Sequence, residues 1–210
     1  MTRVLIVDDH AVVRQGLSRI LADQEGIEVG GEASTGRQAI QMGKLEAWDL
    51  VILDVSLPDG SGFEVLQELR HAKPDLPILV LSVHKETQYA LRTLRAGAAG
   101  YLTKECAPDE LVQAIRRVEK GGKYVSLDLA ESLANVLAGE HEPIAHDALS
   151  DREFETLRML GSGLSVSQIA EELAISPKTV STYRRRILDK LGLETTAELI
   201  RYALEHDLTP

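Results

Sequence analysis

The sequence predicts a doubly wound α/β domain with a five-stranded parallel sheet, followed by a second, smaller all-α helix-turn-helix domain. Over residues 1–122, short β-rich runs alternate with stretches whose apolar residues recur at a spacing near 3.6. That alternation is typical of βα units and a parallel sheet. Over residues 148–210, four helix-start signals follow one another, so we expect only helices there.

Composition limits the class of protein. The chain has 210 residues, of which 44% are hydrophobic, enough for one large core or two small ones. No apolar run approaches the ~18 residues of a membrane span, so we expect a cytoplasmic protein with no membrane partner. The single cysteine, Cys106, cannot form an internal disulfide, and the six histidines show no metal-ligand spacing.

The five expected strands are the β-rich runs of the first 122 residues. They are too apolar to face water on either side, so helices must cover both faces of the sheet. Capping-box patterns at Thr35-x-x-Gln38 and Ser61-x-x-Glu64 mark two helix starts, and Pro108 suits a first helical turn. The expected strands are RVLIV, IEVGGEA, LVILDV, ILVLSV and GYLTK.

Polar residues follow these strands at one edge of the sheet. Asp8 and Asp9 follow the first strand, Asp54 ends the third, Ser82 ends the fourth and Lys104 follows the fifth. Ligands bind beyond the carboxyl ends of parallel strands. Three carboxylates brought together repel one another unless a cation lies among them, and Mg²⁺ suits carboxylate oxygens. Together the residues describe a phosphoryl pocket in which a carboxylate can act as the nucleophile.

Each of these residues has an ordinary explanation when it is taken alone. Adjacent aspartates after a buried strand are more often a solvated turn, and a lone lysine is usually a surface charge. The five together at successive strand ends form a much rarer combination, which favours a functional site.

The motifs of the first 122 residues carry a resemblance to a known family. They are VDD at 7–9, LDVSLPDGSG at 53–62, VLS at 80–82 and GYLTK at 100–104. With them, residues 1–122 resemble the flavodoxin-like receiver domain of two-component response regulators.

This resemblance implies a role for each pocket residue. Asp54 would accept a phosphoryl group from a sensor histidine kinase. Asp9 and Asp54 would bind Mg²⁺ directly together with the backbone carbonyl of Ser56, and Asp8 would act largely through water. Ser82 and Tyr101 would form the switch pair, and Lys104 would contact the phosphoryl group.

Residues 123–147 change in character. They contain a possible short helix from Leu127 to Leu137, followed by Gly139, Pro143 and several acidic residues. We interpret the segment as a linker with a helical first half.

Residues 148–210 contain a basic segment within an acidic protein. The net charge of the chain is −10, yet residues 176–190 hold five basic residues against one acidic residue. The helix expected there places Val180, Tyr183 and Ile187 on an inward face. The opposite face carries charge and small hydroxyl groups, which suits the major groove of DNA, although a solvated basic face remains the alternative.

The segment LSDREFETLRMLGSGLSVSQIAEELAISPKTVSTYRRRILDKLGL resembles the LuxR-type helix-turn-helix, and its pairing with a receiver is that of the NarL/FixJ family. The resemblance places Ser181, Thr182 and Arg185 near bases and Lys178, Arg184 and Lys190 near phosphates. Positions 181 and 183 are more often Lys and His in that family, so its sequence preference does not carry over. The implied dimer contact on the last helix, Thr196 to His206, is Leu199, Ile200, Ala203 and Leu204, with closure of the domain core as the alternative.

The expected function is that of a DNA-binding transcription regulator, not an enzyme. Phosphorylation of Asp54 would favour a homodimer that reads inverted half-sites in promoter DNA about one helical turn apart. One alternative is regulation by protein interaction without phosphorylation. A less favoured alternative is a Mg²⁺-dependent phosphatase. The sequence argues against it because it has no DxD followed by Thr or Ser and no second catalytic acid.

Overall fold

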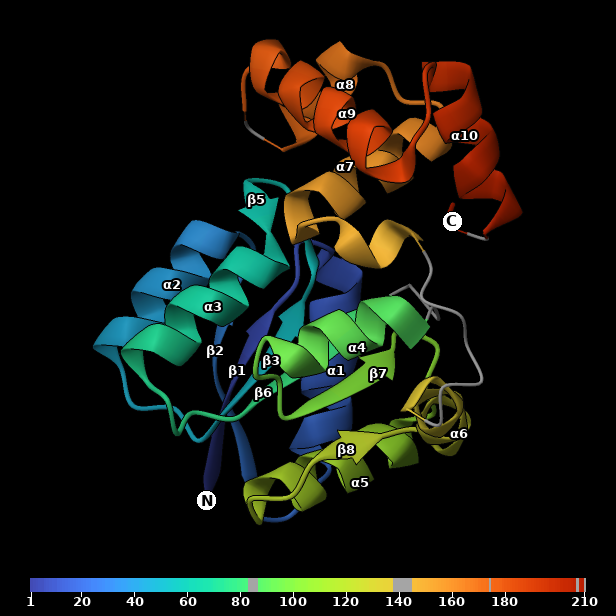
Figure 1. Ribbon diagram of the computed structural model, residues 1–210. Helices are drawn as coiled ribbons and strands as arrows, with labels where there is room; N and C mark the ends of the chain where they lie inside the picture. The colour runs from blue at the N-terminus through green and yellow to red at the C-terminus, as the bar shows by residue number, and fades with distance from the viewer. Residues whose placement is uncertain (83–86, 138–144, 174, 207, 210) are drawn as a thin grey trace. The chain divides into compact units, whose positions relative to one another are not determined.

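The computed structural model describes residues 1–210 except 83–86, 138–144, 174, 207 and 210 (Figure 1). The chain divides into two compact units, Met1–Leu133 and Ala134–Pro210. Within the described residues, no helix is both long and apolar enough to cross a bilayer. The division falls inside the segment expected to be a linker, so the assignment of 123–147 as a separate linker stays a prediction.

The first unit is built on a parallel sheet of six strands in the order β2-β1-β3-β6-β7-β8. Every neighbouring pair is parallel. The doubly wound fold class is confirmed, and one edge strand, β8, was not predicted because two residues are too short to show a β period. The strands are β1 (Thr2–Val7), β2 (Ile27–Ala33), β3 (Leu50–Asp54), β6 (Ile78–Ser82), β7 (Gly100–Thr103) and β8 (Tyr124–Val125).

Helices cover both faces of this sheet because its central strands β3 and β6 are buried along their length and are apolar up to their last residues, Asp54 and Ser82. α1 and α5 contribute Leu17, Leu21, Leu111 and Ile115 to one core cluster with β1, β3 and β6. α2 and α3 lie side by side on the other face (Figure 1). The five helices are α1 (Ala11–Ala22), α2 (Gly36–Leu45), α3 (Gly62–Ala72), α4 (Thr87–Arg95) and α5 (Pro108–Glu119).

The chain between β3 and α3 forms a small antiparallel hairpin of β4 (Ser56–Leu57) and β5 (Gly60–Ser61). A Cβ atom on Gly62 would lie 2.5 Å from the carbonyl oxygen of Asp54, so only glycine permits this approach of α3 to the end of β3. Asp59, in the turn of the hairpin, accepts hydrogen bonds from the backbone N–H groups of Gly36 (2.6 Å) and Arg37 (3.0 Å). The hairpin is thereby attached to the N-terminus of α2.

α6 (Leu127–Leu137) has the bounds that the sequence predicted. Its first half belongs to the first compact unit, and Leu129 is 9% exposed. The 3₁₀-helix η1 (Ala145–Ala148) opens the second unit after a stretch that lies outside the described residues.

The second unit is helical, as predicted. Capping boxes at Ser150–Glu153, Ser165–Gln168 and Thr195–Glu198 start three of its helices, and Ser176 with Pro177 starts the other. Gly192, in the left-handed conformation with φ 67°, ends α9. The helices are α7 (Asp151–Gly161), α8 (Val166–Glu172), α9 (Pro177–Leu191) and α10 (Thr196–Glu205).

Candidate functional site

The expected acidic pocket forms at the carboxyl ends of β1 and β3, which are neighbours in the sheet. Asp8 and Asp54 are each 1% exposed, whereas the side chain of Asp9 is 32% exposed. Two buried carboxylates side by side need positive charge nearby, because burial and mutual repulsion both oppose ionisation.

Lys104 supplies that charge. Its Nζ lies 2.7 Å from Asp54 Oδ2 and 2.7 Å from Asp8 Oδ2. Burial alone would lower the pKa of Lys104, but the hydrogen bonds and charges of Asp54 and Asp8 outweigh it, so the pKa is raised. Lys104 is therefore a fixed cation between the two carboxylates.

The donors of the pocket fit a divalent cation. Asp8 Oδ2 and Asp9 Oδ1 are buried oxygens at the centre of this group, with Lys104 Nζ 2.7 Å from Asp8 Oδ2 and His10 Nδ1 2.6 Å from Asp9 Oδ1. The ligand atoms of Asp8, Asp9, His10 and Asp54 all lie within 4.8 Å of one another. Carboxylate oxygens at this spacing are the donors that Mg²⁺ takes. Ser56, two residues after Asp54, begins β4 beside them.

His10 was missed at the level of sequence. A histidine next to two aspartates matches no metal-ligand spacing, and its position depends on how the loop after β1 turns. In the structure its Nδ1 lies 2.6 Å from Asp9 Oδ1 and 3.3 Å from Asp8 Oδ1.

The two residues of the expected switch pair lie on neighbouring strands. Ser82 ends β6 and is fully buried, and Tyr101 lies on β7 and is 1% exposed. The backbone N–H of Lys104 donates to the carbonyl of Ser82 at 2.7 Å. The backbone of Lys104 is thus directly linked to the strand that carries Ser82.

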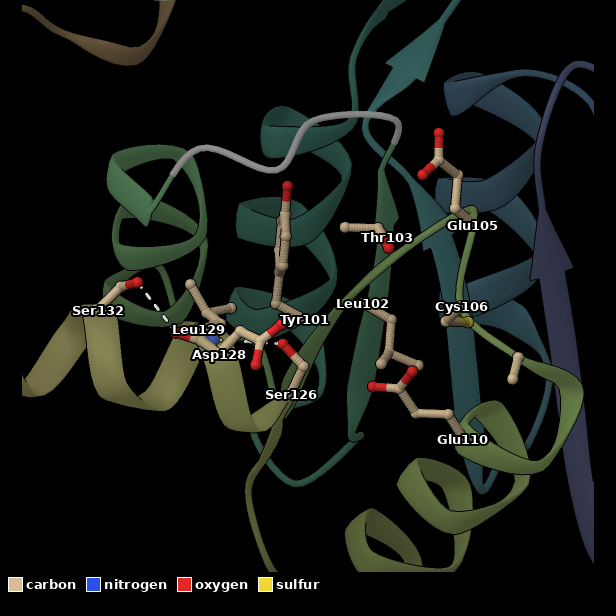
Figure 2. Close-up of a pocket in the computed structure, with 11 residues that line it drawn as sticks. Tyr101, Leu102, Thr103, Glu105, Cys106, Glu110, Ser126, Asp128, Leu129 and Ser132 are labelled. Carbon is tan, nitrogen blue, oxygen red and sulfur yellow. Dashed lines mark hydrogen bonds between the residues drawn. The ribbon is translucent and has the colours of Figure 1, made fainter.

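Tyr101 also lines a pocket of about 370 Å³ beside α6 (Figure 2). In Figure 2 the side chain of Tyr101 extends from β7 away from α6, and Leu129 of α6 lies near its base. Burial in the same pocket raises the pKa of Cys106 to about 11. The remaining lining residues are Leu102, Thr103, Glu105, Ala107, Glu110, Ser126, Asp128 and Ser132.

α9 has the inward and outward faces that its sequence predicted. Val180 and Ile187 are fully buried, whereas Lys178, Thr182, Arg185 and Arg186 are exposed. Arg184 and Ser181 are partly exposed. The outward face is therefore basic and accessible, as a major-groove helix requires.

The hydroxyl groups on this face are oriented by the helix itself. Ser181 Oγ donates to the carbonyl of Pro177, and Thr182 Oγ1 donates to the carbonyl of Lys178, each at 2.9 Å. Each hydroxyl proton is already donated to a backbone carbonyl, so the hydroxyl oxygens of Ser181 and Thr182 can act only as acceptors toward a ligand.

The side chain of Lys190 contacts another helix of the same domain. Its Nζ lies 2.7 Å from Oε2 of Glu153 on α7, which is 3% exposed. Glu153 Oε2 also accepts from the backbone N–H of Ser150 at 2.9 Å. Lys190 therefore joins α9 to the start of α7, and its expected place near a phosphate stays a prediction.

The apolar stripe of α10 is divided between the domain core and the surface. Leu199 and Ala203 are fully buried within the unit, Ile200 is partly exposed and Leu204 is 56% exposed. Core closure therefore accounts for Leu199 and Ala203, and the residues available to a second copy are Ile200 and Leu204.

Comparisons with known proteins agree with this architecture. Residues 4–116 match the response regulator receiver domain, and residues 147–203 match the luxR family of bacterial regulatory proteins. The fold and the two regions together define a DNA-binding two-component response regulator. The chain is 40% identical over 209 residues to the response regulator UvrY of Escherichia coli K12, covering 99% of this chain and 96% of UvrY. This chain belongs to the NarL/FixJ family of response regulators.

Two further proteins extend the comparison. The response regulator GacA of Pseudomonas aeruginosa is 39% identical over 212 residues, covering 99% of this chain and 98% of GacA. The structure of RcsB from Salmonella enterica serovar Typhimurium, bound to promoter rprA in the presence of phosphomimetic BeF3⁻, is 27% identical and has a TM-score of 0.71, covering 96% of this chain and 97% of RcsB. The likeness spans both domains.

Proposed function

We propose that Asp54 accepts a phosphoryl group from the phosphohistidine of a sensor histidine kinase, and that this phosphorylation controls DNA binding. The observation that carries the proposal is the contact of Lys104 with both Asp54 and Asp8, 2.7 Å each, in a buried pocket at the strand ends. A buried cation held between carboxylates is arranged to receive the charge of an incoming phosphoryl group.

In the proposed transfer, the bond between phosphorus and the kinase imidazole nitrogen breaks while a bond from phosphorus to an Asp54 carboxylate oxygen forms. The product is an acyl phosphate. Lys104 would exchange its carboxylate contact for a phosphoryl oxygen. Asp9, Asp54 and the carbonyl of Ser56 would hold Mg²⁺ directly and Asp8 through water. The ion, when bound, would neutralise the charge of the transferred group.

The proposed response uses Ser82 and Tyr101. A phosphoryl oxygen on Asp54 gives the Ser82 hydroxyl a new acceptor, which favours a position of Ser82 closer to Asp54 and an inward position of the Tyr101 ring. Because the backbone of Lys104 is bonded to that of Ser82, the pocket and the switch strand move together. The surface formed by α4, β7 and α5 would change as a result.

The proposed output is promoter binding by a homodimer in the cytoplasm. Each α9 would enter a major groove, with Ser181, Thr182 and Arg185 toward bases and Lys178 and Arg184 toward phosphates. Ile200 and Leu204 of α10 would form the contact between copies. The structure of RcsB bound to promoter DNA in the presence of a phosphomimetic supports the link between phosphorylation and promoter binding.

The experiment is a DNA-binding and dimerisation assay on the full chain, with and without acetyl phosphate and Mg²⁺, on the wild type and Asp54→Asn. Duplexes selected from a random pool serve as the DNA. We expect dimerisation and tighter binding only for the phosphodonor-treated wild type. Equal behaviour of all four samples would show that phosphorylation of Asp54 does not control the protein.

A further inference from the structure

His10 lies within the acidic pocket, at its solvent side. Its Nδ1 is 2.6 Å from Asp9 Oδ1 and 3.3 Å from Asp8 Oδ1, and its side chain is 64% exposed. Among the residues that the structure describes, His10 is the one nitrogen donor in the group of potential metal ligands, which otherwise consists of Asp8, Asp9 and Asp54.

The spacing of these atoms suits adjacent ligands of one ion. Neighbouring ligands of an octahedral ion at about 2.1 Å lie roughly 3 Å apart. The distances from Nδ1 to the two carboxylate oxygens, 2.6 and 3.3 Å, fall on either side of that value. A cation bound to Asp9 would therefore lie within reach of the imidazole without a large movement of His10.

The backbone of the loop holds His10 in this position. Its N–H donates to Asp8 Oδ1 at 2.8 Å. The guanidinium of Arg14 donates to the carbonyls of Asp8 (2.7 Å) and Asp9 (3.2 Å). These bonds fix the turn that brings the imidazole back over the carboxylates, so the approach does not depend on the side chain alone.

We propose that His10 is a metal ligand of this pocket and raises its preference for first-row transition ions over Mg²⁺. Imidazole nitrogen binds ions such as Ni²⁺, Cu²⁺ and Zn²⁺ well, whereas Mg²⁺ is bound by oxygen. A pocket built only of carboxylates and a carbonyl lacks the added preference that a nitrogen ligand gives to these ions. The inference rests on the proposed function, because it assigns His10 to the same cation site.

The test compares metal affinities of the full chain, without an affinity tag, by calorimetric titration with MgCl₂ and with NiCl₂. The informative variant is His10→Asn, because the asparagine amide oxygen can take the place of Nδ1 and leaves a donor of the kind that Mg²⁺ accepts. His10→Ala removes the donor altogether. His71→Ala, an exposed histidine in the last turn of α3, is the matched control. Asp9→Asn disables the proposed site.

For His10→Asn we expect Ni²⁺ affinity to fall at least about tenfold, the lower bound for losses of groups that support a metal, with Mg²⁺ affinity nearly unchanged. The visible absorption of bound Ni²⁺ should shift, because a nitrogen ligand is replaced by oxygen. His71→Ala should match the wild type, and equal melting temperatures would show that all variants are folded.

Three different failures can be told apart. If the wild type, His10→Asn and His10→Ala bind Ni²⁺ with one affinity and Mg²⁺ with one affinity, His10 is not a ligand and the inference is wrong, while the cation pocket stands. If neither ion binds the wild type, or Asp9→Asn binds both as before, the proposed cation pocket fails and the inference fails with it. An equal loss of both affinities in His10→Asn would assign His10 a positioning role and also overturn the inference.

Discussion

The ammonium of Lys190 lies 2.7 Å from Glu153 Oε2 and so joins the recognition helix α9 to the start of α7. The same carboxylate oxygen closes the capping box of α7 through the backbone N–H of Ser150. One carboxylate thus serves a helix cap and a contact between helices, which makes Lys190 part of the framework that holds α9 in place.

Replacing Lys190 with methionine should destabilise the DNA-binding domain. The change leaves Glu153 buried without its cation, and we expect a loss of about 1–2 kcal/mol, less than the 3–5 kcal/mol of fully buried pairs because Lys190 is 39% exposed. Denaturant unfolding of the domain measures the effect. Lys178→Met is the matched control on the same helix and should leave stability nearly unchanged; equal losses in both variants would contradict the framework role.

The stability of this domain should also depend on pH through Glu153. Burial would raise the pKa of Glu153, but the hydrogen bonds and charge of Lys190 and the hydrogen bonds of Ser150 outweigh it, so the folded-state pKa lies below the ordinary 4.5. The contribution is therefore complete above pH 4.5 and is lost as pH falls through the lowered pKa. Thermal unfolding from pH 7 to pH 3 should show a steeper decline for the wild type than for Glu153→Gln. If the melting temperatures of the wild type and Glu153→Gln fell in parallel with pH, Glu153 would not be the source of this pH dependence.

The prediction from sequence succeeded where the chain carries local signals. The three capping boxes of the second unit and the bounds of α6 depend on residues a few positions apart, and the structure confirms them. The pocket residues follow from the rule for strand ends, and their contacts with Lys104 agree with it.

What the sequence did not predict depends on contacts between distant residues. The contact of Lys190 with Glu153 joins residues 37 positions apart, on different helices. The stripe of α10 has one hydrophobic period, yet packing buries Leu199 and leaves Leu204 exposed. His10 reaches the carboxylates only because the loop after β1 turns back.

Gly62 should tolerate no side chain. A Cβ there would lie 2.4 Å from Val55 Cα and 2.5 Å from the Asp54 carbonyl oxygen, and backbone atoms cannot move aside as a flexible side chain can. Gly62→Ala should therefore cost about 1–3 kcal/mol, as overpacking does, and should displace Asp54. Chemical denaturation and acetyl phosphate labelling would report the two effects.

Gly16→Ala is the control for this substitution, because Gly16 lies within α1 and a Cβ there meets nothing within 4 Å. It should stabilise the protein by about 0.5–1 kcal/mol, the difference between glycine and alanine inside a helix. If Gly62→Ala were as well tolerated as Gly16→Ala, the close approach of α3 to β3 would not be required.

Cys106 should react slowly with alkylating reagents. Its pKa of about 11 keeps it almost entirely as the neutral thiol at pH 8, so we expect iodoacetamide to modify it roughly 100-fold more slowly than an exposed cysteine of ordinary pKa. The rate should rise about tenfold for each pH unit up to pH 10, because the thiolate is the reactive form. Mass spectrometry of the intact chain follows the reaction.

Leu129 offers a way to test whether burial beside α6 protects Cys106. Both residues line the pocket of Figure 2, and Leu129 is 9% exposed. Leu129→Ala should expose the thiol, lower its pKa toward the ordinary value and accelerate alkylation. Leu127→Ala, on the same helix but at a residue that is 74% exposed, should not change the rate. Equal rates in the two variants would mean that α6 does not cover the pocket in solution, because a helix already detached could not be loosened further.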